Sequence, residues 1–244
     1  IKLYSVMQRL DSQEFLKRLE NVIHRYGLSD VKTKGYKFYG CNSSDGLSAY
    51  NREPFMNLRR DVNQAEVQDE EYYIKLYTLI IYAFNNQIRF NRKGDFNLPP
   101  GKRDFNQNMY DKLSVFLNLL HTQKAVFANL NFKDIDLDHL VPGDFVYADP
   151  PYLITCAAYN EKRGWTEQDE YDLLNLLDSL SRRKIRFGLS NVIESKGRRN
   201  DILDKWVKDR PDYRQIDLDY TYHNANYQRK NRKSVTREVL IVNY

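Results

Sequence analysis

Apolar residues in the first half of the chain recur three and four positions apart, which is the spacing of a buried helix face. Ser12 is a candidate N-cap and Gly27 a candidate stop for one of these helices. Residues 71–84 are apolar on nearly every side, so their helix should be buried on more than one side. The pattern predicts helices at 1–10, 13–26, 50–62, 71–84 and 107–121, and irregular structure at 33–50.

From residue 124 onward, short β-branched and aromatic runs alternate with helical patterns, which is typical of an α/β fold. Thr166 and Asp169 have the spacing of a capping box and should open a helix. We expect strands at 125–128, 145–148, 185–190, 214–222 and 238–243, and helices at 167–182 and 202–208.

Residues 85–106 differ in character, because they are rich in amides, basic groups and aromatic rings. The sequence Arg92-Lys93-Gly94-Asp95 predicts a turn that joins two short extended segments.

Composition narrows the choice of partner only slightly. The 244 residues suffice for one large domain or two small ones, and the net charge of +5 weakly favours a polyanion. The 19 Tyr and 12 Phe could stack on bases, although they could equally fill a core. Cys41 and Cys156 are far apart and the His residues do not cluster with them, so no metal site is expected. The expected compartment is the reducing cytoplasm. No apolar run is long enough for a membrane span.

The most informative motif is Asp149-Pro150-Pro151-Tyr152, directly after the strand predicted at 145–148. Ligands of open α/β sheets bind at the carboxyl ends of strands. A carboxylate oxygen and the Pro150 carbonyl could each accept one N–H of an amine on a planar ring, and the Tyr152 ring could stack on that ring. From the residues alone, a strand end with two prolines and a packing tyrosine is the alternative interpretation.

Residues 145–155, together with 158–160 and Trp165, resemble the catalytic segment of the adenine-N6 DNA methyltransferases. Within that family, the subgroup of GATC-type Dam enzymes, the D12 class with a DPPY motif, is the most similar. The resemblance implies a Rossmann-like core that transfers a methyl group from S-adenosyl-L-methionine to a flipped-out adenine. It implies no metal. The catalytic residues that it implies are Asp149, Pro150, Pro151 and Tyr152, and the cofactor-binding residues are Asn131, Phe132, Asp149 and Tyr159.

A second, independent resemblance covers residues 84–103, which we call the recognition segment. The segment is similar to the target-recognition hairpin of the same subgroup and implies an inserted, mostly helical domain bearing a β-hairpin. Arg89 or Arg103 could read a guanine in the major groove, and Phe84 could wedge near the vacated base. The alternative is a basic hairpin that contacts only phosphates. The DNA-recognition residues implied are Phe84, Asn85, Gln87, Arg89, Asn91, Pro99 and Arg103.

The resemblance begins after the family's aromatic-Gly-Lys segment, glycine-rich cofactor loop and acidic ribose-binding position. The chain starts at Ile1 with a pattern already helical, so we expect a fragment whose sheet has an open edge. The expected organisation is a remnant of the catalytic domain at 1–10, a target-recognition domain at 11–123 and the catalytic domain at 124–244.

The sequence therefore predicts an adenine-specific DNA methyltransferase that acts on duplex DNA, at GATC, as a monomer in a bacterial or phage-infected cell. A restriction-modification role is among those expected. Three alternatives stay open: a cytosine-N4 methyltransferase, whose motif usually begins with Ser; a DNA-binding fragment without catalytic activity; and an RNA or protein amine methyltransferase, whose motif commonly begins with Asn.

Overall fold

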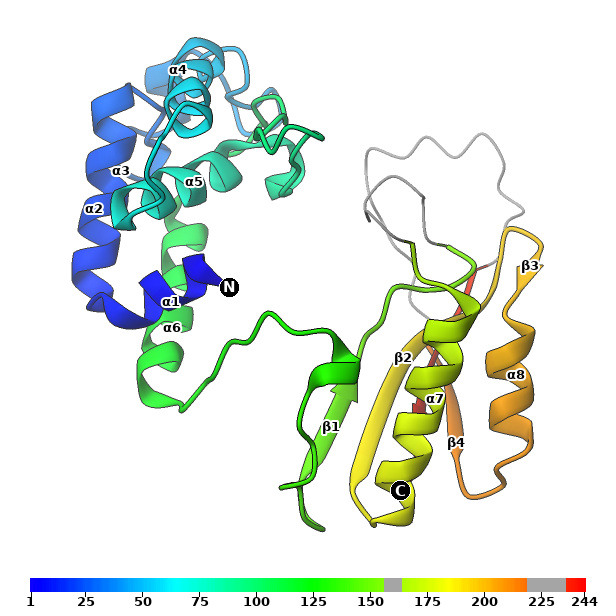
Figure 1. Cartoon of the computed structure of the whole chain (residues 1–244). Coiled ribbons are helices and arrows are strands. Elements are labelled where there is room, and N and C mark those ends of the chain that lie inside the picture. The colour runs from blue at the N-terminus through cyan, green and yellow to red at the C-terminus, as the bar shows by residue number, and fades with distance from the viewer. Residues whose placement is uncertain (156–163, 219–235) are drawn as a thin grey trace. The chain divides into compact units, whose positions relative to one another are not determined.

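The computed structural model describes residues 1–155, 164–218 and 236–244. They form two compact units, Ile1–Asn129 and Leu130–Tyr244, each with its own apolar core (Figure 1). The helix at the start of the chain contributes Val6 and Met7 to the first core. The roles assigned above to residues 1–10, 11–123 and 124–244 stay predictions.

The first unit is helical (Figure 1). It contains α1 (Lys2–Arg9), α2 (Ser12–Tyr26), α3 (Val31–Lys34), α4 (Arg52–Asn63), α5 (Glu70–Tyr82) and α6 (Gln107–Thr122), with short 3-10 turns at Tyr36–Tyr39 and Phe84–Asn86. The five predicted helices are confirmed, each with ends close to those expected. Helix α5 is buried on several sides, as its apolar sequence predicts.

Two local predictions for residues 1–50 are wrong. Asp11, and not Ser12, caps α2, because its carboxylate accepts hydrogen bonds from the backbone N–H groups of Gln13 and Glu14. A carboxylate is the stronger acceptor at the positive end of a helix. The stretch expected to be irregular at 33–50 begins instead with the end of α3 and a 3-10 turn. Gly27 ends α2 in the left-handed conformation, as predicted.

The recognition segment leaves and rejoins the core beside the end of α5. Antiparallel bridges pair Ala83 with Pro100 and Phe90 with Phe96, without forming continuous strands. Gly101 donates its N–H to the Tyr82 carbonyl at 2.7 Å. A side chain on Gly101 would have its Cβ 2.4 Å from the Ala83 carbonyl oxygen, so only glycine allows this approach.

The second unit is a mixed sheet with helices. Its strands are β1 (Phe145–Ala148), β2 (Arg186–Ser195), β3 (Arg198–Arg199), β4 (Arg214–Leu218) and β5 (Thr236–Val242), and its helices are α7 (Glu167–Arg182) and α8 (Asp201–Lys208). Over the described residues the order is β1-β2-β5-β4, with β3 folded back on β2. The β1–β2 pair is parallel and the other pairs are antiparallel. The predicted capping box of Thr166 and Asp169 opens α7.

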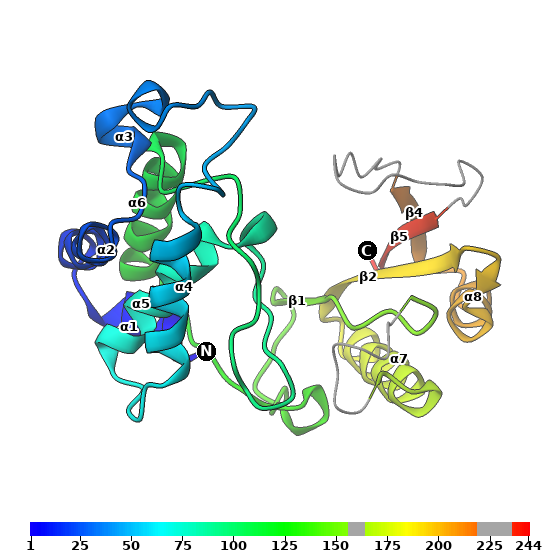
Figure 2. The ribbon, with the colours of Figure 1, turned by 90° about the horizontal axis from the view of Figure 1, so that it is seen from above.

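Helices α7 and α8 cover one face of this sheet (Figure 2). Alternate residues of β2, such as Phe187, Leu189 and Ile193, face these helices, as the period of two requires. Strand β1 lies at the edge of the sheet formed by the described ranges. On β1, Phe145 is 53% and Tyr147 59% exposed. Among the described residues β1 is thus an edge strand, and the loss of a neighbouring first strand stays a prediction.

The strand predicted at 125–128 is wrong. These residues pair with no strand among the described parts of the chain, and Val126 is 91% exposed. An apolar run forms a strand only where a neighbouring strand satisfies its backbone groups. The class α/β is confirmed, and the mixed sheet is consistent with the methyltransferase fold that the resemblance implies.

A buried carboxylate lies in the core of the first unit. Asp104 is 0% exposed, and its Oδ2 accepts hydrogen bonds from Val31 N at 2.9 Å and Ser29 Oγ at 3.2 Å. Its Oδ1 has no hydrogen-bond partner within the described residues. Burial raises the pKa of Asp104 from 3.8 to about 6, although the two hydrogen bonds act to lower it.

This raised pKa predicts that the first unit loses stability as the pH increases. The folded protein binds the Asp104 proton more tightly than the unfolded chain, so the stabilisation is complete below pH 3.8 and is lost as the pH rises through about 6. The full loss, from below pH 3.8 to well above pH 6, should approach about 3 kcal/mol at 1.36 kcal/mol for each pKa unit, and about half of it should fall between pH 5 and pH 8. Asp104→Asn should remove this pH dependence in urea unfolding between pH 5 and pH 8.

The exposed Asp111, which accepts a hydrogen bond from Gln107, provides the control. Asp111→Asn should keep the pH dependence of the wild-type chain. A wild-type free energy of unfolding that is equal at pH 5 and pH 8, or higher at pH 8, would contradict the assignment to Asp104.

Candidate functional site

The tetrapeptide Asp149-Pro150-Pro151-Tyr152 is placed by the parallel pairing of two strands. Ala148, the last residue of β1, is paired with Leu189 of β2, so Asp149 comes level with Ser190. Proline has no backbone N–H, so Pro150 and Pro151 cannot donate to the ladder. The motif therefore lies at the carboxyl end of β1, where the sequence predicts it.

Side chains at this strand end form a small polar cluster. The Tyr152 hydroxyl donates to Asp149 Oδ1 at 3.1 Å and lies 3.3 Å from Ser190 Oγ. Burial raises the pKa of Tyr152 above 10, and the charge of Asp149 raises it further, while the contact with Ser190 lowers it. The hydroxyl is therefore protonated at neutral pH and available as a donor.

Asp149 is exposed, whereas Pro150, Pro151 and Tyr152 are half-buried. Within the described residues, Tyr152 supplies the hydrogen bond to this carboxylate, through Oδ1. An ionised carboxylate has about four acceptor positions, so Asp149 can accept further N–H donors from a ligand. Ser190 is thus in contact with the motif. It is the last residue of the strand predicted at 185–190, and this position was the available signal.

Two of the predicted cofactor residues lie at a 3-10 turn, Phe132–Asp134. Asn131 caps this turn, since its Oδ1 accepts a hydrogen bond from Lys133 N at 3.0 Å. The half-buried Phe132 ring packs against Trp165, with centroids 5.5 Å apart. Such an aromatic pair and the exposed charge of Asp149 suit an adenine ring and an amino group, so the residues present fit part of S-adenosylmethionine. Tyr159 lies outside the described residues.

Several polar side chains of the recognition segment form hydrogen bonds within the segment. Arg89 donates from Nε to Asn97 Oδ1 at 2.7 Å and from Nη2 to the Asn97 carbonyl at 3.0 Å. Asn91 holds the turn, because its Oδ1 accepts from the backbone N–H groups of Lys93 and Asp95. These two residues therefore shape the segment in this structure, and their predicted DNA contacts stay predictions.

Other predicted recognition residues are exposed at the surface of the first unit. Arg103 is exposed and makes a long hydrogen bond of 3.4 Å to the Ser43 carbonyl. Phe84 is 40% exposed, next to Asn85, which has a left-handed backbone with φ of 55°. Gln87 and Pro99 are also exposed. The segment thus presents an aromatic ring, amides and a guanidinium to solvent.

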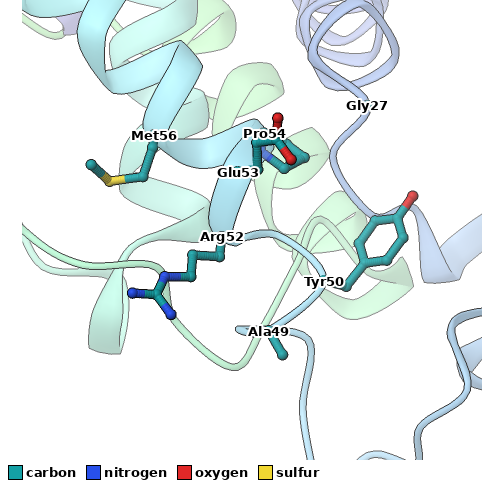
Figure 3. A pocket seen from close by; sticks show the side chains of 7 residues that line it. All are labelled: Gly27, Ala49, Tyr50, Arg52, Glu53, Pro54 and Met56. Carbon is teal, nitrogen blue, oxygen red and sulfur yellow. The ribbon is translucent and has the colours of Figure 1, made fainter.

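A shallow pocket lies elsewhere in the first unit, between the end of α2 and the start of α4 (Figure 3). Its lining residues are Gly27, Ala49, Tyr50, Arg52, Glu53, Pro54 and Met56. None of the predicted site residues is among them, so the pocket adds nothing to the candidate site.

No three or more His, Cys, Asp and Glu side chains in the described parts of the chain are grouped so that they could hold a metal ion. No helix there combines the length and the apolar character needed to cross a membrane.

Comparison with known proteins places the chain in a family. A family model described as D12 class N6 adenine-specific DNA methyltransferase matches residues 11–231. Modification methylase StsI of Streptococcus sanguinis is 39% identical over 206 residues, which cover 82% of this chain and 30% of that protein. Type II methyltransferase M.FokI of Planomicrobium okeanokoites is 32% identical over 250 residues, covering 100% of this chain and 34% of that protein.

Modification methylase LlaI of Lactococcus lactis subsp. lactis is 29% identical over 243 residues, covering 96% of this chain and 32% of that protein. The chain thus spans about a third of the length of these relatives. Since the family model matches most of the chain, and its most informative motif lies at a strand end with an exposed carboxylate, the chain belongs to the D12 class of N6 adenine-specific DNA methyltransferases.

Proposed function

We propose that this chain provides the adenine-binding and DNA-reading parts of an enzyme that methylates adenine N6 in duplex DNA. The observation that carries the proposal is the exposed Asp149 carboxylate next to Pro150 and Tyr152 at the end of β1. Family membership supports adenine as the target base. Relatives named modification methylases support a place in a restriction-modification system. A GATC site rests on the resemblance of the recognition segment alone.

The chemistry assigned to the motif follows from the electronic structure of adenine. The N6 lone pair is delocalised into the ring, which makes the amine a poor nucleophile. Asp149 would accept one N6 hydrogen and the Pro150 carbonyl the other, which localises the lone pair on nitrogen. Tyr152 would stack on the flipped base and contribute roughly 1–3 kcal/mol. This offsets the few kcal/mol that extrusion of the base costs.

The methyl donor proposed is S-adenosyl-L-methionine, which supplies an activated methyl group when bound. Phe132 would contact its adenine, with Asn131 beside it, and Asp149 would accept a hydrogen bond from its amino group. Tyr159 is assigned to the same ligand by resemblance.

Replacing Asp149 tests the catalytic assignment. Asp149→Ala should lower methyl transfer by about 10²- to 10³-fold, the usual cost of one lost hydrogen-bonding group in a reaction centre. Binding to duplex DNA should be largely unchanged, because the recognition segment is intact. Incorporation of labelled methyl groups and gel mobility shifts measure the two quantities.

Asp201, whose side chain is 86% exposed, provides a matched control, and Asp201→Ala should keep wild-type transfer. Unchanged turnover in Asp149→Ala would refute the assignment. A wild-type chain that binds duplex DNA but neither binds S-adenosylmethionine in calorimetry nor transfers methyl groups would favour the DNA-binding alternative.

The two arginines of the recognition segment should behave differently. Arg103→Ala should relax discrimination at one base pair by about 1–3 kcal/mol, as expected when a bidentate guanine contact is lost. Arg89→Ala should weaken binding to all sequences together, because Arg89 holds Asn97 across the segment. Anisotropy titrations against a set of duplexes, each substituted at one position of GATC, measure both effects.

Repeating these titrations at several salt concentrations separates base reading from phosphate contact. If Arg103 contacts only a phosphate, Arg103→Ala weakens every duplex equally and reduces the salt slope by about one. That outcome would contradict base reading by Arg103. Equal affinity for all single-position variants in the wild type would contradict GATC as the site.

A further inference from the structure

Glu170 is a fully buried carboxylate in the second unit. It lies in the first turn of α7, is 0% exposed, and accepts hydrogen bonds from three side chains. Trp165 Nε1 donates to its Oε2 at 2.6 Å. Asn200 Nδ2 and Asn191 Nδ2 donate to its Oε1 at 2.8 Å and 3.3 Å. A buried carboxylate is costly unless its oxygens are hydrogen-bonded, and these three N–H donors satisfy it.

Each donor belongs to a different segment. Asn191 follows Ser190 on β2, and Ser190 is the residue whose hydroxyl meets Tyr152. Trp165 precedes α7 and packs its ring against Phe132. Asn200 caps α8 by accepting from Leu203 N at 3.1 Å. One carboxylate therefore links the part of β2 beside the catalytic motif to the aromatic pair assigned to the cofactor.

The geometry points to Glu170 as a positioning residue that fixes both of these walls of the methyl-transfer site. The inference rests on the function proposed above and extends it to a residue that does not touch either substrate. Through Asn191, Glu170 holds the part of β2 that presents Ser190 to Tyr152. Through Trp165, it holds the ring against which Phe132 packs. Adjacent residues of a strand point to opposite faces, so Asn191 can be anchored beneath the sheet while Ser190 stays at the motif.

Burying polar groups costs desolvation free energy, and apolar side chains of similar size often stabilise a core as well or better. What such a network adds is a defined geometry, because each N–H must meet its acceptor at a fixed distance and angle. Misplacement of reacting groups by about 1 Å can cost about 100-fold in rate. The network at Glu170 is therefore expected to affect turnover more than folding.

The same helix offers a matched control. Asp178 lies about two turns further along α7, and its side chain is 13% exposed. It also accepts an indole N–H, from Trp206 Nε1 at 3.2 Å, and it contacts Arg210 and Tyr213. None of these three partners contacts the tetrapeptide or Phe132 in any hydrogen bond or ring contact within the described residues.

The experiment compares Glu170→Gln with Asp178→Asn in the whole chain, at a temperature where circular dichroism shows both folded. The Gln amide would place an N–H group toward other donors, so the walls should shift. Glu170→Gln should lower kcat for methyl transfer by about 10- to 100-fold. Asp178→Asn should lower the unfolding temperature and leave kcat near the wild-type value. Equal kcat in wild type and a folded Glu170→Gln would overturn the inference.

A spectroscopic readout separates this inference from the proposed function. The chain has two tryptophans, so a Trp206→Phe background makes Trp165 the sole indole. Adding Glu170→Gln to it should increase iodide quenching of Trp165, because the ring is released from its anchor. If the wild type transfers no methyl groups, the proposed function fails, and unchanged quenching then overturns the positioning role independently.

A second variant covers the case in which Glu170→Gln does not fold. Trp165→Phe keeps a ring against Phe132 but removes the indole donor to Glu170. It should raise the KM for S-adenosylmethionine more than the KM for DNA, because the disturbed wall is the one assigned to the cofactor. A folded Trp165→Phe chain with both KM values unchanged would contradict the role of this contact.

Discussion

The position of the candidate site depends on the parallel pairing of β1 with β2 and on where it ends. A parallel ladder fixes both strands to one register, since a slip by one residue would turn every side chain to the wrong face. Val146 and Ala148 of β1 pack against the core beneath the sheet, so the register cannot slip without exposing them. Two prolines then stop the ladder. Asp149 is thereby held level with Ser190, and Tyr152 can contact both.

In the recognition segment, the tip must face solvent while the base stays rigid. Phe96 is buried at 1% exposure, and Asn63 of α4 hydrogen-bonds both its N–H and its carbonyl. Gly101 closes the base against the end of α5 at a distance that no other residue allows. Loops that carry function are commonly held in this way by a rigid scaffold. The exposed Phe84 and Arg103 are therefore presented from fixed points.

Local signals in the sequence were sufficient for the helices, for the capping box of Thr166 and for the strand end at Asp149. Each depends on residues within one turn or one short strand. Apart from the N-cap of α2 and the short helical turns at 31–39, which are local, the differences lie where the outcome depends on distant partners. Residues 125–128 have the composition of a strand, but no strand within the described ranges pairs with them. Arg89 hydrogen-bonds Asn97, eight positions away, a contact that the sequence did not predict, while the DNA contact of Arg89 stays a prediction. The Glu170 network joins donors 5, 21 and 30 positions away, which no periodicity reveals.

The contact between Tyr152 and Asp149 explains how a charged, exposed carboxylate can be kept ready for an amine. Without a partner, a carboxylate at a strand end would sample several rotamers, and ordering it would oppose binding. The Tyr152 hydroxyl holds it at Oδ1. When an N–H takes that position, Ser190 Oγ, 3.3 Å away, can accept the hydroxyl hydrogen instead. No polar group is then left unpaired, so the exchange costs little, and the carboxylate is already oriented when the base arrives.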